Sequence, residues 1–449
     1  MSRNKIFFND VLPKVADILS AQTLPPDVEP LVIRDIHGRI RIALDMPRSS
    51  VADEIITDLD QSLSALGAYS SGKGKNVLCG DDFFDPNSIF NSPEILQWVQ
   101  PNGNKTVRIL NRLVTGQDWD SHEESHKTKK TRLVFFGIKG GVGRSTALAI
   151  LAYKLANSGK KVLLIDLDLE SPGLSGLLLP QNRLADFGVV DWLIEDALGQ
   201  GDEALRSMIS VSPLSEYTQG EIRIAAAMGI DDTNYLDKLS RAYGDVAING
   251  KAETFTQRIR RLVDKLEETE QPDVVLIDSR AGLHDLAAVS IVGLATTAFL
   301  FATDTEQSWQ GYRLLFSHWQ SFPKIARNVR ERLAIVQALF PEADQSKRAR
   351  HFLEQSYQLF SETLYEEIPP SPADQPSNAL DFQEDLFNFD IEIENAPHYP
   401  LRINWNNRFQ EFDPKLLGQQ GLFSEAEIEA SFGNFMDKAI QLIGDAHRE

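Results

Sequence analysis

Short apolar runs alternate with amphipathic stretches between residues 132 and about 340. Near-continuous apolar runs are typical of strands that are buried on both faces and form a mainly parallel sheet covered by helices. The runs that predict such strands are residues 133–136, 162–165, 222–225, 274–277 and 298–301. This pattern predicts a doubly wound α/β domain at residues 132–340.

The first 119 residues predict a separate, small α/β module. Apolar residues recur at helical spacing in residues 9–20 and 51–66. Two β-rich runs, residues 31–36 and 39–44, are separated by His37 and Gly38, which indicates a hairpin. Residues 107–110 predict a later strand.

Residues 71–75 are rich in glycine and could be interpreted as a phosphate loop. No strand pattern precedes this stretch and no clear helical pattern follows it. A phosphate loop needs both. We therefore favour an ordinary loop.

The remaining segments predict a linker and a C-terminal extension. Residues 120–131 contain no apolar residue, so a solvated linker is favoured over a metal site built from their histidines and glutamates. Residues 341–449 predict a helical, loop-rich region that packs on the central domain, with a long Pro-rich loop at residues 368–381. Its last helix has one apolar face but lacks the basic opposite face of a membrane-surface helix. The apolar residues of that face are Ile428, Phe432, Phe435, Met436, Ala439, Leu442 and Ile443.

The composition indicates which binding partners are disfavoured and in which cellular compartment the protein is expected. The 449 residues carry 65 acidic and 45 basic side chains, a net charge of −20. Such a charge disfavours a membrane surface and unaided, nonspecific DNA binding. No apolar run is long enough to span a bilayer. Because Cys79 is the single cysteine and the N-terminus lacks a signal-peptide pattern, we expect a cytoplasmic protein without an intrachain disulfide.

The strongest chemical signal follows the first central strand. A glycine-rich turn and then a helical pattern come directly after residues 133–136. Glycines allow successive N–H groups to point at phosphate oxygens, and the helix adds its positive N-terminal dipole. We expect ATP here, with the Ser145 hydroxyl on Mg²⁺. The expected nucleotide-binding residues are Gly137, Lys139, Gly140, Gly141, Val142, Gly143, Arg144, Ser145 and Thr146.

This loop resembles the deviant phosphate loop of the ParA/MinD group of ATPases, in the SIMIBI class. The resemblance rests on Ile138 followed by Lys139, Gly140 and Gly141. It implies that Lys139 crosses a dimer interface to the partner subunit's phosphates. Arg144 departs from the family, which has lysine there. Arginine keeps the charge, but its planar fork reaches differently, so the hydrolysis rate stays open.

Three further stretches resemble the same family in the same order. Residues 162–174 resemble the second strand and first switch, where Asp168 matches the aspartate that orients the attacking water. Residues 274–282 resemble the Walker B strand and second switch. There Asp278 would help to hold Mg²⁺ and Gly282 would offer its N–H to the γ-phosphate. Residues 303–308 match a polar turn.

The resemblance implies an ATPase that dimerises with ATP and controls a protein partner, with the N-terminal module binding that partner or regulating the ATPase. Arg144 motivates an alternative, a nucleotide-binding scaffold with negligible hydrolysis. A kinase-like transferase is a third hypothesis, disfavoured because no acceptor site is visible in the sequence. Participation in a multi-gene system, such as phage defence or partition, stays open. Residues 395–400 could hold the base, although a structural turn there, including His398, is favoured.

Overall fold

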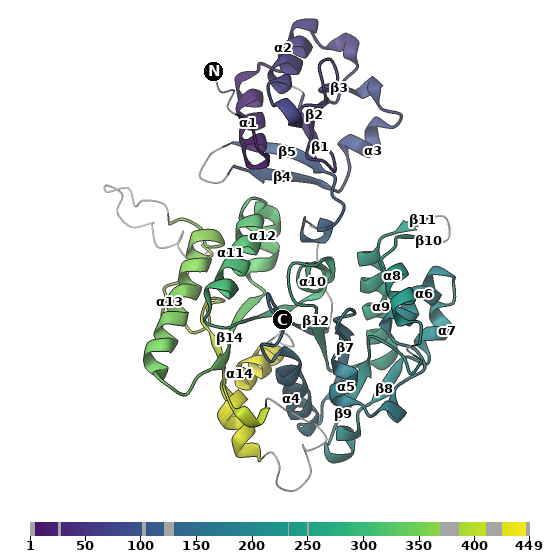
Figure 1. The fold of residues 1–449 in the computed structure, drawn as a ribbon, viewed down its shortest axis with the longest axis vertical. Helices are drawn as coiled ribbons and strands as arrows, with labels where there is room; N and C mark the ends of the chain where they lie inside the picture. Colours follow the sequence, from purple (N-terminus) through teal and green to yellow (C-terminus); the bar gives the residue numbers. More distant parts are fainter. Residues whose placement is uncertain are drawn as a thin grey trace. The chain divides into compact units, whose positions relative to one another are not determined.

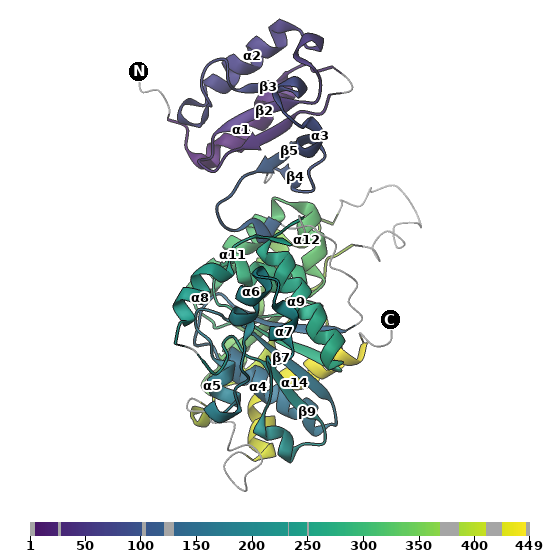
Figure 2. The same ribbon diagram turned by 90° about the vertical axis from the view of Figure 1, so that its right-hand side faces the viewer.

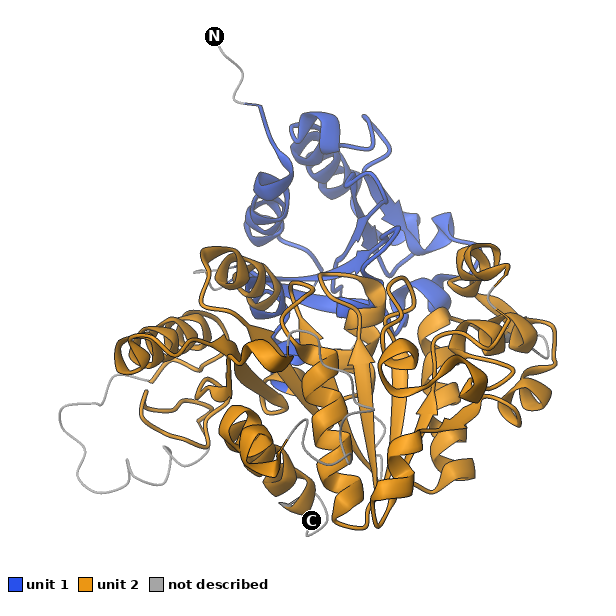
Figure 3. Ribbon diagram, turned by 60° about the horizontal axis from the view of Figure 1, so that its bottom comes forward, with its two compact units in different colours: residues 1–121, 317–327 blue, residues 122–316, 328–449 orange. Residues whose placement is uncertain are grey.

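The structure is a computed structural model that describes residues 5–25, 28–100, 105–120, 130–231, 233–248, 251–368, 386–409 and 424–445. It divides into two units (Figure 3). Unit 1 comprises residues 1–121 and 317–327, and unit 2 comprises residues 122–316 and 328–449. Most of the expected linker, at residues 121–129, and residues 369–381 of the expected Pro-rich loop lie outside the described residues.

Unit 1 contains a mixed five-stranded sheet in the order β3-β2-β1-β5-β4 (Figure 1). The expected hairpin is present, because β1 pairs with β2 antiparallel, and β1 also pairs with β5 in parallel. The elements are α1 (Phe8–Ala21), β1 (Leu31–Arg34), β2 (Ile40–Leu44), α2 (Asp53–Ser64), β3 (Val77–Cys79), α3 (Pro86–Phe90), β4 (Ile95–Val99) and β5 (Thr106–Asn111).

The glycine-rich stretch at residues 71–75 is a loop ahead of β3, as expected. The N–H of Gly74 donates to the carboxylate of Asp60 at 2.7 Å, and Asn76 donates to the same carboxylate through its backbone and its side chain at 3.1 and 3.0 Å. A carboxylate of the chain therefore accepts the N–H group of Gly74 that a phosphate loop would offer to a nucleotide.

Unit 2 is built on an eight-stranded sheet in the order β15-β14-β13-β6-β12-β7-β9-β8. Every neighbouring pair is parallel except β8 with β9. The strands are β6 (Thr131–Gly137), β7 (Lys161–Leu167), β8 (Ile209–Val211), β9 (Glu221–Ala225), β12 (Val274–Ser279), β13 (Thr297–Ala302), β14 (Leu333–Phe340) and β15 (Leu401–Asn404). A small hairpin of β10 (Val246–Ile248) and β11 (Lys251–Glu253) is separate from this sheet.

Helices cover both faces of this sheet, which confirms the doubly wound α/β fold (Figures 1 and 2). Leu133 and Phe135 of β6 share a core with α4 and α14. The next residue along, Phe136, meets Tyr312 of α11. The helices are α4 (Arg144–Asn157), α5 (Leu174–Leu178), α6 (Val189–Ala197), α7 (Gly201–Leu205), α8 (Tyr235–Ala242), α9 (Phe255–Glu270), α10 (Asp285–Ala288), α11 (Glu306–Gln320), α12 (Pro323–Arg330), α13 (Gln345–Thr363) and α14 (Glu425–Asp445).

The C-terminal region is part of the same core. The ring of Phe435 in α14 lies 5.1 Å from that of Phe299 and 6.0 Å from that of Phe135. The last helix therefore packs on the chain's own core, as expected. Strand β15 extends the main sheet, so residues 341–449 contribute a strand as well as helices. No helix among the described residues is long and apolar enough to cross a bilayer.

Candidate functional site

The glycine-rich turn lies between the carboxyl end of β6 and the start of α4. Gly141 and Gly143 have φ angles of 74° and 81°, in the left-handed region that favours glycine. A Cβ atom added at Gly140 or Gly141 would meet no other heavy atom within 4 Å. The outer surface of the turn is therefore open, and its backbone can approach a ligand closely.

Carboxylates gather beside this turn because β7 and β12 are parallel neighbours. Their register places Asp278 opposite Asp166. Asp166 is fully buried and accepts N–H groups from Asp168 and Leu174, both at 3.1 Å. Ser145, in the first turn of α4, donates its hydroxyl to Asp278 at 2.6 Å. Ligands of open α/β sheets bind at this end of the strands.

These carboxylates resist ionisation. Burial, and then the charge of Asp278, raise the pKa of Asp166 well above its ordinary value. Burial raises the pKa of Asp278 to about 6, although Arg144 and the Ser145 hydroxyl oppose the shift. Burial also raises the pKa of Asp168, against the charges of Arg144 and Arg280. Ionising these carboxyl groups would place negative charge in a buried site, and a cation would lower this cost.

A divalent cation fits the residues present. Asp278 Oδ1 is buried without a hydrogen-bond partner in the part of the chain that the structure describes. The Ser145 hydroxyl lies against the other oxygen of the same carboxylate. Mg²⁺ prefers oxygen ligands and is held in phosphate sites by one or two carboxylates together with the phosphates. Ser145 and Asp278 are therefore the residues that would hold it, and Mg²⁺ would neutralise phosphate charge there.

Arg144 does not project into the open side of the turn. Its guanidinium donates to the backbone carbonyl of Ser279 at 2.6 Å and to Asp168 at 3.3 Å, and its side chain is 7% exposed. Arg144 thus ties the start of α4 to the ends of β12 and β7. A lysine, with one ammonium group on a flexible stem, does not offer this planar fork.

The remaining expected site residues lie around the same turn. Lys139 is partly exposed, and Thr146 follows Ser145 in α4. Val142 packs its side chain into the core, so it can offer a ligand only its backbone. The N–H of Gly282, expected to meet a γ-phosphate, donates instead to the carbonyl of Gly137 at 3.0 Å in this structure. A phosphate contact would require this hydrogen bond to open.

The structure favours a structural role for His398. It is fully buried, and its two ring nitrogens contact the Tyr365 hydroxyl and the backbone carbonyl of Ile391. Burial lowers the pKa of His398, so the neutral ring is favoured. The polar turn at residues 303–308 follows β13, and its hydroxyl groups bond to one another at the start of α11.

Sequence reasoning missed further charged residues next to these carboxylates. Glu170, two residues after Asp168, contacts Arg280, two residues after Asp278. Both residues lie beyond the ends of β7 and β12, so the pattern of the strands did not indicate this contact. Tyr243, at the end of α8, also contacts Glu170. No motif in the sequence marks Tyr243, because only the packing of α8 brings it there.

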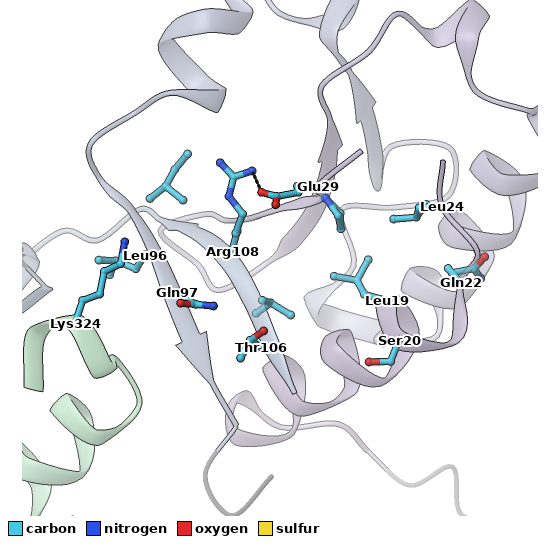
Figure 4. A pocket seen from close by; sticks show the side chains of 13 residues that line it. Leu19, Ser20, Gln22, Leu24, Glu29, Leu96, Gln97, Thr106, Arg108 and Lys324 are labelled. Atoms are coloured by element: carbon cyan, nitrogen blue, oxygen red, sulfur yellow. Dashed lines mark hydrogen bonds and ion pairs between the residues drawn. The ribbon is translucent and has the colours of Figure 1, made fainter. Parts of the chain in front are cut away.

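Unit 1 has a separate hollow of about 540 Å³ between the end of α1 and strands β4 and β5 (Figure 4). One of the two cations that line it, Arg108, already pairs with Glu29 at 3.0 Å. Ser20 likewise donates to a carbonyl of its own helix. The hollow does not identify a ligand.

Comparison with known proteins assigns this chain to a family. Residues 133–372 match the CobQ/CobB/MinD/ParA nucleotide binding domain, which is more than half of the chain. The chain belongs to this family. The chain is also similar to the septum site-determining protein MinD of Helicobacter pylori, with 31% identity over 146 residues. That match covers 32% of this chain and only 43% of the relative.

Two solved structures of the CobQ/CobB/MinD/ParA type are also similar. A pNOB8 ParA bound to nonspecific DNA has 14% identity and a TM-score of 0.41, covering 70% of this chain and 99% of that one. Cobyrinic acid a,c-diamide synthase from Mycobacterium smegmatis, with a bound ATP analogue and magnesium, has 18% identity and a TM-score of 0.35, covering 57% and 92%. At these scores neither likeness assigns a ligand or a partner to this chain.

We expect Asp278→Asn to stabilise the nucleotide-free protein at pH 7.5. Because the pKa of Asp278 is raised to about 6 by folding, its ionised form lowers the free energy of unfolding above that pH. Asparagine removes this penalty and should raise the melting temperature in EDTA by about 2–6 °C. The gain should shrink as the pH falls from about 6 toward the ordinary aspartate value near 4.

The same variant should lose the thermal stabilisation that Mg²⁺ with ATP gives the wild type, because it lacks the anionic ligand. Scanning calorimetry with EDTA or with Mg²⁺ and ATP measures both effects. A variant that melts below the wild type in EDTA at pH 7.5, or that keeps the full response to Mg²⁺ with ATP, contradicts the assignment.

We expect Arg144→Ala to lower the free energy of unfolding by about 3–5 kcal/mol, because it leaves buried Asp168 without its partner. Arg144→Lys keeps the positive charge and should lose less. Arg183→Ala is the control, since it removes an exposed arginine paired with Glu216. Urea unfolding of the three variants tests this order, and equal losses for Arg144→Ala and Arg183→Ala would refute it.

Proposed function

We propose that this protein is a Mg²⁺-dependent ATPase that works as a dimerisation switch. The observation that carries the proposal is the convergence of the open turn, the Ser145–Asp278 pair and Asp168 at one end of the sheet. The turn would bind the phosphates, and Asp168 would orient the attacking water. Ser145 and Asp278 would hold Mg²⁺. Phosphoryl transfer needs mainly such positioning and charge neutralisation.

Lys139 is the residue that would join two subunits. Its side chain is partly exposed, and no hydrogen bond or ion pair of this side chain occurs among the described residues. In the proposed dimer it contacts the phosphates bound to the partner subunit. ATP then acts as part of the interface, and hydrolysis releases the dimer or a protein partner.

Unit 1 is the candidate for contact with that partner. It has its own mixed sheet and its own buried core, and the family match begins only at residue 133. The net charge of −20 disfavours unaided binding to DNA. We propose that unit 1 binds a protein partner or regulates the ATPase.

A nucleotide-binding scaffold with negligible turnover is the second candidate, and the Arg144–Asp168 pair favours it. In this pair the carboxylate that should orient water is occupied by the cation that should contact phosphate. Steady-state phosphate release decides between the two functions. Release by the wild type that clearly exceeds that of Asp168→Ala supports the ATPase, and equal release supports the scaffold.

Mixing two inactive variants tests whether Lys139 acts across the interface. Lys139→Ala and Asp168→Ala should each lack activity alone. In a mixed dimer, the subunit that keeps Asp168 receives Lys139 from its partner, so one complete site forms. With random pairing across a two-fold interface, an equimolar mixture should recover about a quarter of wild-type activity.

Phosphate release by each variant and by the mixture measures this recovery. Lys238→Ala mixed with Asp168→Ala is the control, because Lys238 lies in α8 and pairs with Asp191 of its own chain. This control mixture should show only the activity of its own Lys238→Ala sites. Absence of recovery in the test mixture, while the wild type is active, refutes action of Lys139 in trans.

A further inference from the structure

A cluster outside the expected machinery adjoins the site. The carboxylate of Glu170 contacts the guanidinium of Arg280 and the hydroxyl of Tyr243 through the same oxygen. His284 Nε2 lies 3.8 Å from this oxygen. Arg280 and Glu170 have side chains that are 28% and 21% exposed, so the pair is half-buried and still reachable from solvent.

The sheet register places Arg280 beside the reacting centre. Asp278 lies opposite Asp166, and Ser279 lies opposite Leu167. Asp168 and Arg280 are the first residues after the ends of β7 and β12. The positive charge of Arg280 accordingly lowers the pKa of Asp168, against the larger effect of burial. Arg280 is therefore within electrostatic reach of the carboxylate proposed to orient water.

A second cation from the same subunit would help to balance the charge of the site. Asp166, Asp168, Asp278 and Glu170 place four carboxylates at the ends of β7 and β12. Arg144 is engaged with Asp168 and with a backbone carbonyl. A triphosphate adds further negative charge, which Mg²⁺ and one engaged arginine would neutralise only in part.

We propose that Arg280 is a phosphate-contacting arginine supplied by the same subunit, held on Glu170 without nucleotide and transferred to the terminal phosphate when nucleotide binds. This inference rests on the proposed ATPase function. The contact with Glu170 holds the guanidinium near the position where negative charge would develop on the transferred phosphoryl group. Arginine suits this role because its fork can make two parallel hydrogen bonds to phosphate oxygens.

The surroundings of Glu170 support such an exchange. Glu170 Oε2 is buried without a hydrogen-bond partner within the described ranges, so Arg280 holds only one of the two carboxylate oxygens. A phosphate that offers two oxygens can compete with this contact. Tyr243 stays a neutral donor, because burial and then Glu170 raise its pKa above the ordinary value. Glu170 therefore keeps a hydrogen bond after Arg280 leaves.

The test compares Mg²⁺–ADP binding with and without aluminium fluoride, which mimics the phosphoryl group in the transition state of transfer. The readout is the dissociation constant from calorimetry, so it does not require turnover. Wild type should bind at least about 10-fold more tightly with aluminium fluoride, as expected for donors aimed at transition-state charge. Arg280→Ala should gain at most about 2-fold, with ADP affinity within about 3-fold of wild type.

Matched variants separate a phosphate contact from a structural ion pair. Glu170→Gln weakens the pair but keeps Arg280, so it should retain or increase the tightening by aluminium fluoride. Arg241→Ala is the control, because Arg241 is an exposed arginine of α8 that is 68% exposed and pairs with Asp237. It should behave as wild type. Unchanged ADP affinity in each variant shows that the site still folds.

Three outcomes overturn the inference: Arg280→Ala tightens like the wild type, Glu170→Gln loses the tightening like Arg280→Ala, or the wild type does not tighten. Each is distinguishable from failure of the proposed switch, which is measured separately by ATP-dependent dimerisation. A chain that dimerises with ATP, while its Arg280→Ala variant binds the mimic normally, keeps the proposed function and refutes the role of Arg280.

Discussion

The buried carboxylates at the ends of β7 and β12 are the constraint on which the rest of the site depends. Parallel pairing sets Asp166 and Asp278 opposite each other, away from water. Buried charges of like sign are costly unless cations or hydrogen bonds compensate them. Arg144, Ser145 and the N–H groups after β7 supply part of that compensation. The remainder is the driving force for a divalent cation.

The cation at position 144 contacts different groups from those that the family resemblance implies. The resemblance implies a lysine that contacts phosphate, whereas the guanidinium here spans α4, Ser279 and Asp168. The same side chain can therefore stabilise the site without nucleotide and restrain Asp168, the carboxylate that we propose orients water. If the guanidinium of Arg280 contacts the terminal phosphate as proposed, Arg144 can keep its contact with Asp168 while the phosphate charge is still neutralised. Lys139 remains available for a second subunit.

Sequence predicted the fold well where one signal dominated. The five apolar runs became parallel strands, and four of them are almost completely buried, whereas β9 keeps polar residues at Glu221 and Arg223. Strand β14 (Leu333–Phe340) is just as apolar, but it was not separated from the neighbouring helical pattern. Strand β15 (Leu401–Asn404) has only four residues after a turn-rich segment, and it becomes a strand through pairing with β14.

The site was predictable in its parts but not in its contacts. Local motifs singled out the turn, Ser145, Asp168 and Asp278, and the structure brings these residues to one end of the sheet. The engagement of Arg144 with Ser279, and of Gly282 with the carbonyl of Gly137, depends on distances between strand ends. The pairing of Glu170 with Arg280 likewise depends on how the segments after β7 and β12 fold against each other. Tertiary packing determines such contacts.

The most direct measurement is the molar mass of Asp168→Ala by light scattering, with Mg²⁺ and either ATP or ADP. Asp168→Asn is the companion variant, because it keeps an oxygen acceptor for Arg144. If Asp168 orients the attacking water as proposed, its loss should trap the triphosphate state. The account predicts a mass near 50.2 kDa with ADP and about twice that with ATP, as for a two-fold dimer. The same mass with both nucleotides would contradict the switch.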